Sequence, residues 1–232
     1  MSHLDRAAVC LTAACLLSIV SIPARAQAAD FAPFESGERL AYRLLWPSGI
    51  PHGEAVFEVS SQGDELHFQV TVEASLPQYR VTGLFSAVAA RDGLCSRQFH
   101  QKIQEGSKTT EESLEFDQTA FPDRNTTTAA IPECARDPLT FLYYARSRMA
   151  AGQPVDWGSM HYGKQIALQL GPGESGVLSL GGTPWQGEKF LVRFPSRGGE
   201  RVVEVWFSTD AARTPLQFTV PTTLADFKAE LE

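Results

Sequence analysis

A glycine-rich stretch at residues 171–176 is the first segment whose residue types could do chemistry. Gly171-Pro172-Gly173-Glu174-Ser175-Gly176 has the G-x-G-x-x-G spacing of a dinucleotide-binding loop. That chemistry requires the glycines to open a helix whose first amides meet a phosphate. Here Pro172 has no amide hydrogen, and the following Val177-Leu178-Ser179-Leu180 has the composition of a strand. The sequence therefore predicts a hairpin turn at this position and no phosphate site.

Spacing does not indicate a serine nucleophile or a metal site. Ser179 precedes Gly181 by two residues, but Val177 stands where G-x-S-x-G requires its first glycine, so we expect Ser179 inside a strand. The histidines that follow the first 28 residues are far apart and show no H-E-x-x-H pattern: His52, His67, His100 and His161. We therefore expect no catalytic residue, metal or cofactor, although carboxylates from separate strands could still assemble a hydrolytic site.

The segment from Ser208 to Pro215 joins two apolar stretches and contains Asp210 and Arg213. In the structural interpretation, Asp210 caps the turn and Arg213 pairs with a carboxylate. In the functional interpretation, both side chains hold a ligand or a partner. We favour the structural interpretation.

The first 28 residues predict export. An apolar run from Ala7 to Ile22 follows Arg6, Pro23 ends it, and Ala24-Arg25-Ala26 supplies a small-x-small cleavage signal. We expect residues 1–26 to be a signal peptide that directs the protein to the periplasm, with Ala28 as an alternative cleavage point. An uncleaved anchor is disfavoured because a membrane span takes about 20 apolar residues, and no later stretch is long enough to be one.

Cysteine usage agrees with export. Cys10 and Cys15 lie within the signal peptide, which leaves Cys95 and Cys134 in the mature chain. In an oxidising compartment two cysteines most simply form one disulfide, whereas two free thiols or a metal-binding pair are the alternatives.

Composition restricts the class of protein. A hydrophobic content of 43% with 10% aromatic residues is typical of a globular domain. The net charge of −7 argues against binding to nucleic acid or to anionic lipid by charge, and loss of the signal peptide makes the chain slightly more acidic.

Alternating polar and apolar residues predict an antiparallel sheet with one wet face. The alternation covers residues 38–44, 53–59 and 65–72, and similar segments follow at 99–104, 108–116, 165–170, 176–180, 190–194, 202–207, 216–220 and 226–231. Residues 79–90 predict a weak helix or an irregular strand. We expect one β-rich domain over residues 27–232.

One helix interrupts the strands between Asp137 and Gly152. Asp137 is a good N-cap, Pro138 suits the first helical position, and Gly152 suits the end. A single face carries Leu139, Leu142, Tyr143 and Met149, while Arg146 and Arg148 suit the helix dipole near the C-terminus. The expected fold is mostly β: a curved antiparallel sheet or open β-barrel with one helix packed against it.

Several segments, in this order, resemble the exported bacterial family known as domain of unknown function 3108. They are Gly37-Glu38-Arg39-Leu40-Ala41-Tyr42 with Trp46 and Gly53-Glu54-Ala55, Leu94 to Phe99 with Phe116-Asp117, Asp137-Pro138-Leu139-Thr140 with Tyr143 and Arg146, Val205 to Asp210, Arg213 to Leu216, and Ala229-Glu230-Leu231. The sequence departs from the family between Thr222 and Phe227, where a glycine is usual. The resemblance implies an exported β-rich domain of unassigned activity, and it transfers no catalytic residue. A looser analogy links such sheets to the Lol-type periplasmic lipoprotein carriers, in which a curved sheet closes around a lid helix.

The leading functional hypothesis is a non-enzymatic periplasmic module that binds an apolar ligand or an envelope protein. If the concave face of the sheet holds a ligand, its wall includes Trp46, Phe57, Phe68, Tyr143 and Trp206; the alternative is that these side chains only fill the core. Two further hypotheses are a cell-envelope hydrolase with carboxylates from separate strands, and a structural or assembly factor of the envelope.

Overall fold

The computed structural model describes residues 34, 37–76, 80–116, 134–155, 159–162, 164–196, 199–221 and 226–232. The predicted signal peptide and both of its cleavage points lie outside these residues. The elements, in chain order, are β1 (Glu38–Leu45), β2 (Pro51–Gln62), β3 (Glu65–Ser75), β4 (Arg80–Ala90), β5 (Ser96–Glu105), β6 (Lys108–Glu115), α1 (Pro138–Ala150), β7 (Ser159–His161), β8 (Gln165–Ala167), β9 (Gln169–Leu170), β10 (Glu174–Leu180), β11 (Thr183–Ser196), β12 (Gly199–Ser208), β13 (Pro215–Pro221) and β14 (Asp226–Leu231).

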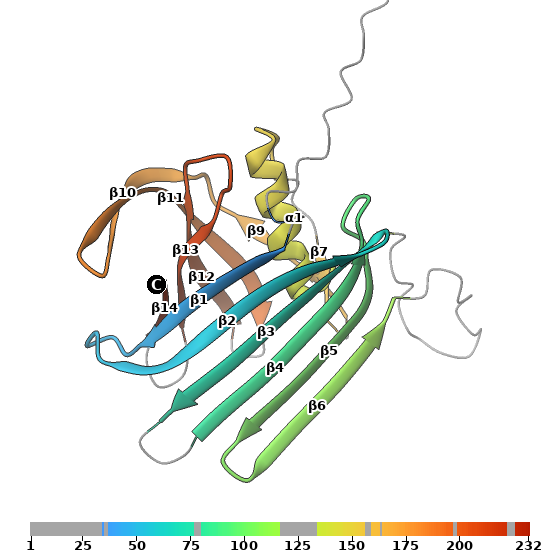
Figure 1. Cartoon of the computed structure of the whole chain (residues 1–232), viewed down its shortest axis with the longest axis horizontal. Helices are drawn as coiled ribbons and strands as arrows, with labels where there is room; N and C mark the ends of the chain where they lie inside the picture. Colours follow the sequence, from blue (N-terminus) through green and yellow to red (C-terminus); the bar gives the residue numbers. More distant parts are fainter. Residues whose placement is uncertain are drawn as a thin grey trace, which may run out of the picture.

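Most strands belong to one antiparallel sheet. Its order is β10-β11-β12-β13-β14-β1-β2-β3-β4-β5-β6, and β9 pairs with β11 off this path. The last strand, β14, pairs with the first, β1, so the first and last strands lie side by side in the middle of the sheet. Within the described residues the outer strands β6 and β10 pair with no partner that would close the sheet (Figure 1). The expectation of a mostly β fold with a large, unclosed antiparallel sheet is confirmed.

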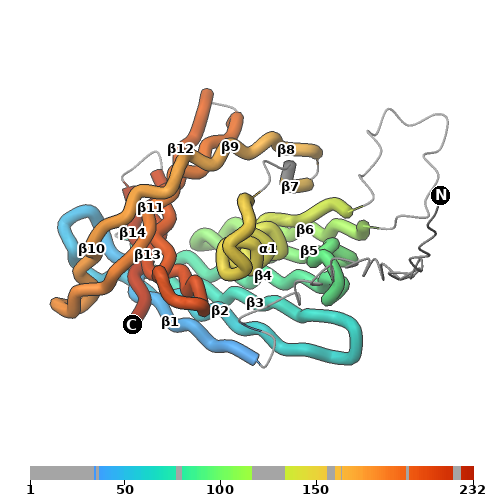
Figure 2. The backbone as a smooth tube through the Cα atoms, turned by 90° about the horizontal axis from the view of Figure 1, so that it is seen from above, coloured from blue at the N-terminus to red at the C-terminus, as the bar shows by residue number. Residues whose placement is uncertain are grey.

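The sheet curls around α1, which lies on its inner side (Figure 2). On one flank of the helix, Tyr143 packs against Phe68 of β3, with ring centroids 4.6 Å apart. On the other flank, Ala145 and Met149 join a buried cluster with Phe190 of β11. Because β3 and β11 lie far apart in the order of the sheet, contact of both with one helix requires strong curvature.

Side chains alternate between the two faces of the sheet as the sequence predicts. The inner face carries the core, with Tyr42, Val59 and Phe68 buried, whereas the outer face carries exposed ion pairs such as Arg39–Glu58 and Arg80–Glu73. This division is the usual arrangement of an antiparallel sheet with one solvated face.

The helix begins and ends where the sequence predicts. The carboxylate of Asp137 caps its first turn, Pro138 occupies the first position, and Gly152 adopts a left-handed φ of +65° just after the end. The predicted apolar face is only partly right, because Leu139 and Leu142 are half-buried while Arg146 is completely buried. The interpretation of Arg146 as a residue that serves the helix dipole is therefore wrong. Among the described residues, no helix is long and apolar enough to cross a membrane.

Residues 80–90 form a strand, β4, whose register against β5 shifts between Val88 and Ala89, while Tyr79 lies outside the described residues. Of the two alternatives for this segment, the irregular strand is confirmed and the helix is wrong. Two other local predictions need correction. Gly171-Pro172-Gly173 is not a hairpin turn, because β9 and β10 on either side of it both pair with β11. It is an interruption along one edge of the sheet. The strand predicted at 165–170 is likewise divided into β8, which pairs with β7, and β9.

Candidate functional site

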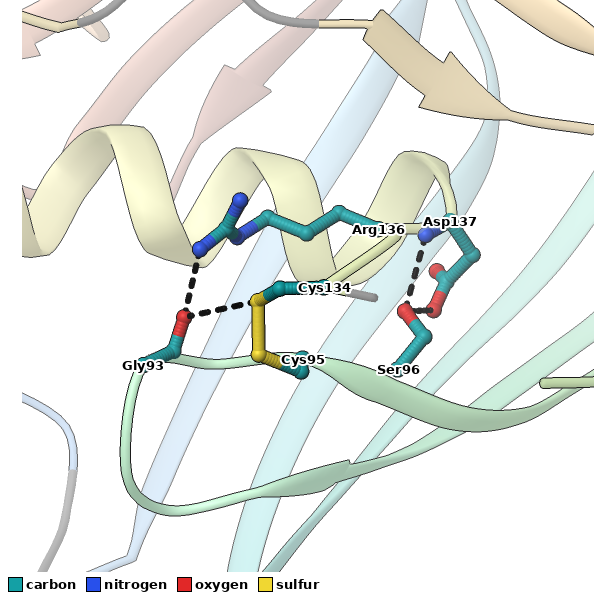
Figure 3. The surroundings of a disulfide bond; sticks show 6 residues. All are labelled: Gly93, Cys95, Ser96, Cys134, Arg136 and Asp137. Carbon is teal, nitrogen blue, oxygen red and sulfur yellow. Dashed lines mark hydrogen bonds between the residues drawn. A yellow bond between two sulfur atoms is a disulfide. The ribbon is translucent and has the colours of Figure 1, made fainter. Parts of the chain in front are cut away.

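The N-terminal end of α1 is fixed to the start of β5 by adjacent covalent and hydrogen-bonded links (Figure 3). A disulfide joins Cys95 to Cys134, as expected for the two cysteines that follow the predicted signal peptide. Next to it, Ser96 Oγ donates to Asp137 Oδ2 at 2.6 Å and accepts from the Asp137 amide at 2.8 Å. Arg136 Nη2 also donates to the Gly93 carbonyl at 2.6 Å. These contacts hold the first turn of the helix against the sheet.

Asp137 is a structural carboxylate, although it is buried. Its Oδ1 accepts from the amides of Leu139 and Thr140, and its Oδ2 accepts from the hydroxyls of Ser96 and Thr140. Burial raises the pKa of Asp137, while these hydrogen bonds act in the opposite direction. Since both oxygens are engaged in the cap, the arrangement positions the helix and leaves no oxygen for acid–base chemistry.

Arg146 fixes the middle of the same helix. Its Nη1 and Nη2 donate to the two carboxylate oxygens of Glu38 at 2.5 and 2.7 Å, and its Nε donates to the Ala212 carbonyl at 2.8 Å. This two-pronged geometry is the strongest form of an arginine–carboxylate pair. The rings of Phe34 and Tyr143 lie against the guanidinium, and burial raises the pKa of Tyr143 well above its ordinary value.

The helix is therefore fixed at two points and does not match a hinged lid. No sequence pattern predicted the Glu38–Arg146 pair, because its members lie 108 positions apart.

The inner face of the sheet also carries apolar side chains that are only half-buried, and three of them, Phe85, Val203 and Phe218, pack against the buried clusters beside the helix. We call this surface the concave apolar face; strand register places its members on one side of the sheet, and they are Leu44, Phe57, Val72, Phe85, Val203 and Phe218. Phe57 and Phe218 stack with centroids 5.9 Å apart and cover Tyr42, which is itself fully buried and donates its hydroxyl to the Pro215 carbonyl.

The five residues predicted to line a ligand site occupy four different environments. Phe68 and Tyr143 are in the packed core beside the helix. Phe57 belongs to the concave apolar face. Trp46 is half-buried at the end of β1, where it contacts His52 and Phe227 with centroids 5.1 and 4.7 Å away. The structure therefore brings only part of the predicted set together.

Trp206 lies on the opposite, outer face of the sheet. It lies over Gly176 and Gly187, where an added Cβ would come within 3.1 and 3.0 Å of its ring. Its Nε1 donates to Glu204 at 3.0 Å. Its role is to fill the space left by two glycines on neighbouring strands, and it does not face α1.

Polar side chains connect the β7–β8 hairpin to the inner side of β5 and β6. Tyr162 donates its hydroxyl to Glu112 Oε2 at 2.6 Å and accepts a hydrogen bond from Gln101. Burial, followed by the bond to Glu112, raises the pKa of Tyr162 to about 12. The hairpin lies between the two edges of the sheet (Figure 2), so this contact ties it to the β6 side.

Asp210 and Arg213 follow the structural interpretation. Asp210 Oδ1 accepts from the Ser208 hydroxyl and from the amides of Ala212 and Arg213, and Arg213 pairs with Glu188 at 3.0 Å. Ser179 lies within β10, as expected. In the part of the chain that the structure describes, no three histidine, cysteine, aspartate or glutamate side chains gather as a metal site would require.

These features define a mostly β protein whose large antiparallel sheet curls, without closing, around a fixed helix. The chain belongs to the family described as protein of unknown function DUF3108, whose model matches residues 39–232. The resemblance found in the sequence is thus confirmed. No curated protein matches the chain.

Three solved structures are similar to this chain at low sequence identity. A β-barrel-like protein of domain of unknown function DUF1849 from Brucella abortus matches with a TM-score of 0.48 and 11% identity, covering 84% of this chain and 94% of that one. A Bacteroides fragilis protein described as exported, with a YmcC-like fold, has a TM-score of 0.34 and 7% identity, covering 85% and 94%. A Parabacteroides distasonis protein described as a lipoprotein has a TM-score of 0.36 and 8% identity, covering 88% and 96%.

Proposed function

We propose that this protein is an exported, non-enzymatic binding module that holds an apolar ligand against its concave apolar face. The observation that carries the proposal is the row of half-buried hydrophobic side chains on the inner side of the curled sheet. Fully packed interiors bury such side chains completely, and contiguous exposed apolar surface commonly marks a binding site. The disulfide is compatible with a location outside the cytoplasm.

The fixed helix supports a particular mode of access. Because α1 is held by the disulfide, the Ser96–Asp137 contact and the Glu38–Arg146 pair, removing it as a lid would break all three. A ligand reaches the concave apolar face more cheaply along the side of the sheet that the helix does not cover. The aromatic pair Phe57–Phe218 is then the first surface that an apolar group meets.

Native mass spectrometry of the protein purified from its own periplasm tests the proposal. We expect a mass excess that disappears when the same sample is denatured. In parallel, the emptied protein should increase the fluorescence of the apolar dye 1-N-phenylnaphthylamine.

Two substitutions give the dye experiment its control. Phe57→Ser removes an aromatic ring from the concave apolar face, whereas Leu84→Ser removes an exposed leucine from the outer face of β4. We expect a several-fold weaker dye affinity for Phe57→Ser and an unchanged affinity for Leu84→Ser. A bare native mass together with absent dye binding, or an equal loss in both variants, would overturn the proposal in favour of a structural or assembly role.

A further inference from the structure

A cavity of about 500 Å³ lies where the C-terminal end of α1 meets the inner side of β11. Its volume falls within the range of small-molecule sites. The apolar part of its wall comes from three separate segments, and the side chains are Met149, Val155, Leu170, Pro172 and Phe190. Glu188 and Arg213 are the charged residues of the same wall. An apolar cavity with one pair of opposite charges has the composition of a specific site.

The interrupted sheet edge creates this cavity. Gly171-Pro172-Gly173 separates β9 from β10 along β11, so the chain leaves the sheet there. Gly173 makes room for Glu188, because a Cβ at Gly173 would lie 2.1 Å from Glu188 Oε1. The glycine of the segment that resembled a nucleotide loop therefore serves to admit a carboxylate.

Arg213 is held in an unusual conformation at the cavity wall. Its φ of +46° is in the left-handed region, which residues other than glycine adopt only rarely. The carboxylate and carbonyl of Asp210 impose it here, since both accept from the Arg213 amide at 3.2 Å. Such enforced conformations cluster at functional sites.

The charged pair leaves binding capacity on both partners. Arg213 Nη1 donates to Glu188 Oε2 at 3.0 Å and to the Ser208 carbonyl at 3.5 Å. Both bonds use one nitrogen of a guanidinium that has five donors. Glu188 Oε2 faces Arg213, whereas Oε1 lies on the side of Gly173. Within the described residues, one edge of the guanidinium and one carboxylate oxygen thus remain for a ligand.

We propose that this cavity binds a small zwitterion that carries an apolar group. An anion alone would compete with Glu188 for Arg213, and a cation alone would compete with Arg213 for Glu188. A molecule with an adjacent ammonium and anion satisfies both, and the helix C-terminus, with its partial negative charge, favours the ammonium further. The apolar wall accommodates the attached hydrocarbon. The cavity shares no lining residue with the concave apolar face, although Val203 and Phe218 pack against the same cluster as Met149 and Phe190, and the inference does not depend on the proposed function.

Titration calorimetry with the mature, full-length protein tests the inference. Both a free amino acid and a lipid with a zwitterionic headgroup have the required chemistry. L-leucine and a short-chain lysophosphatidylethanolamine are the probes that distinguish these two sources. We expect one of them to bind, and removal of either charge from leucine, as N-acetyl-leucine or leucine methyl ester, to weaken binding about tenfold or more, the scale of one charged hydrogen bond. Failure of both zwitterions to bind, or equal binding of the analogues, would overturn the proposal.

Three variants assign the binding to the charged pair. Glu188→Gln and Arg213→Gln should each weaken binding about tenfold, and Gly173→Ala should weaken it by displacing the carboxylate without removing a charge. The control is Arg193→Gln. Arg193 lies on β11, the strand that also carries Glu188, and forms an exposed ion pair with Glu200 of β12. A loss in the control as large as in Arg213→Gln contradicts a built site. Urea midpoints verify that each variant folds. If Arg213→Gln loses zwitterion binding but still binds the dye, the loss concerns this cavity and not the proposed function.

Discussion

Replacing Glu38 by alanine should destabilise this protein far more than a comparable change at the surface. Arg146 is 0% exposed and Glu38 is 16% exposed. Removing Glu38 leaves a buried guanidinium with the Ala212 carbonyl and the Thr214 hydroxyl as its remaining hydrogen-bond partners. Breaking a buried ion pair in this way costs about 3–5 kcal/mol, because the desolvated charge loses its compensation. We expect the lower end, about 3 kcal/mol, because Glu38 is not fully buried.

Urea unfolding followed by circular dichroism, with the disulfide intact, measures this change. For a domain of this size a loss of about 3 kcal/mol corresponds to a fall in Tm of roughly 6–12 °C. The matched control is Glu58→Ala, which breaks the neighbouring pair Arg39–Glu58, whose side chains are 62% and 48% exposed. Exposed pairs contribute about 0–1 kcal/mol, so the control should change little.

A double variant separates the ion pair from the packing around it. Glu38→Leu combined with Arg146→Met replaces both charges by apolar groups of similar length. Because no charge is then left buried, we expect the double variant to recover most of the stability that Glu38→Ala loses. The reasoning is refuted if Glu38→Ala costs no more than Glu58→Ala, or if the double variant is less stable than Glu38→Ala.

Three other predictions concern the frame of the sheet and helix. Replacing Cys95 and Cys134 by alanine removes a link across 39 positions; the chain-entropy relation gives a loss of about 4 kcal/mol, measurable as a lower urea midpoint that dithiothreitol does not change further. Gly53→Ala should cost about 1–3 kcal/mol by overpacking, because its Cβ would lie 2.1 Å from a backbone carbonyl oxygen. Gly171→Ala should cost much less, because the nearest atom would be 3.6 Å away. Equal urea midpoints for the two variants would contradict this. Burial lowers the pKa of His161, so the neutral form stabilises the fold; this contribution is present above the unfolded value of about 6.5 and is lost as the pH falls through the lower folded value. From pH 7 to pH 5, the free energy of unfolding of the wild type should therefore fall relative to that of His161→Phe. A difference that stays constant over this range would exclude this role.

The candidate site could be predicted only in part. The sequence predicted that Phe57 lines a ligand site, which stays a prediction; the structure places Phe57 on a half-buried apolar face. It grouped Trp206 with Phe57, although the two lie on opposite faces of the sheet. Alternation along one strand shows which of its residues share a face. It does not show whether that face lies on the same side of the sheet as a given face of another strand, because that depends on the register between the strands. The cavity with Glu188 and Arg213 escaped prediction for the same reason, since its wall comes from segments that meet only after folding.

The sequence by itself determined the local structure. Period-two alternation specified most strands, because side chains of a strand alternate between faces, and Asp137, Pro138 and Gly152 specified both ends of the helix through the requirements of its terminal backbone groups. The sequence also predicted the Cys95–Cys134 disulfide, because these are the two cysteines that follow the predicted signal peptide. Only the tertiary structure decided that β14 pairs with β1, that the sheet curls around the helix, and that Arg146 is buried against Glu38. Those outcomes depend on contacts between segments that lie far apart in the sequence. Such contacts stabilise the protein only after folding, and they produce no periodic pattern in the sequence.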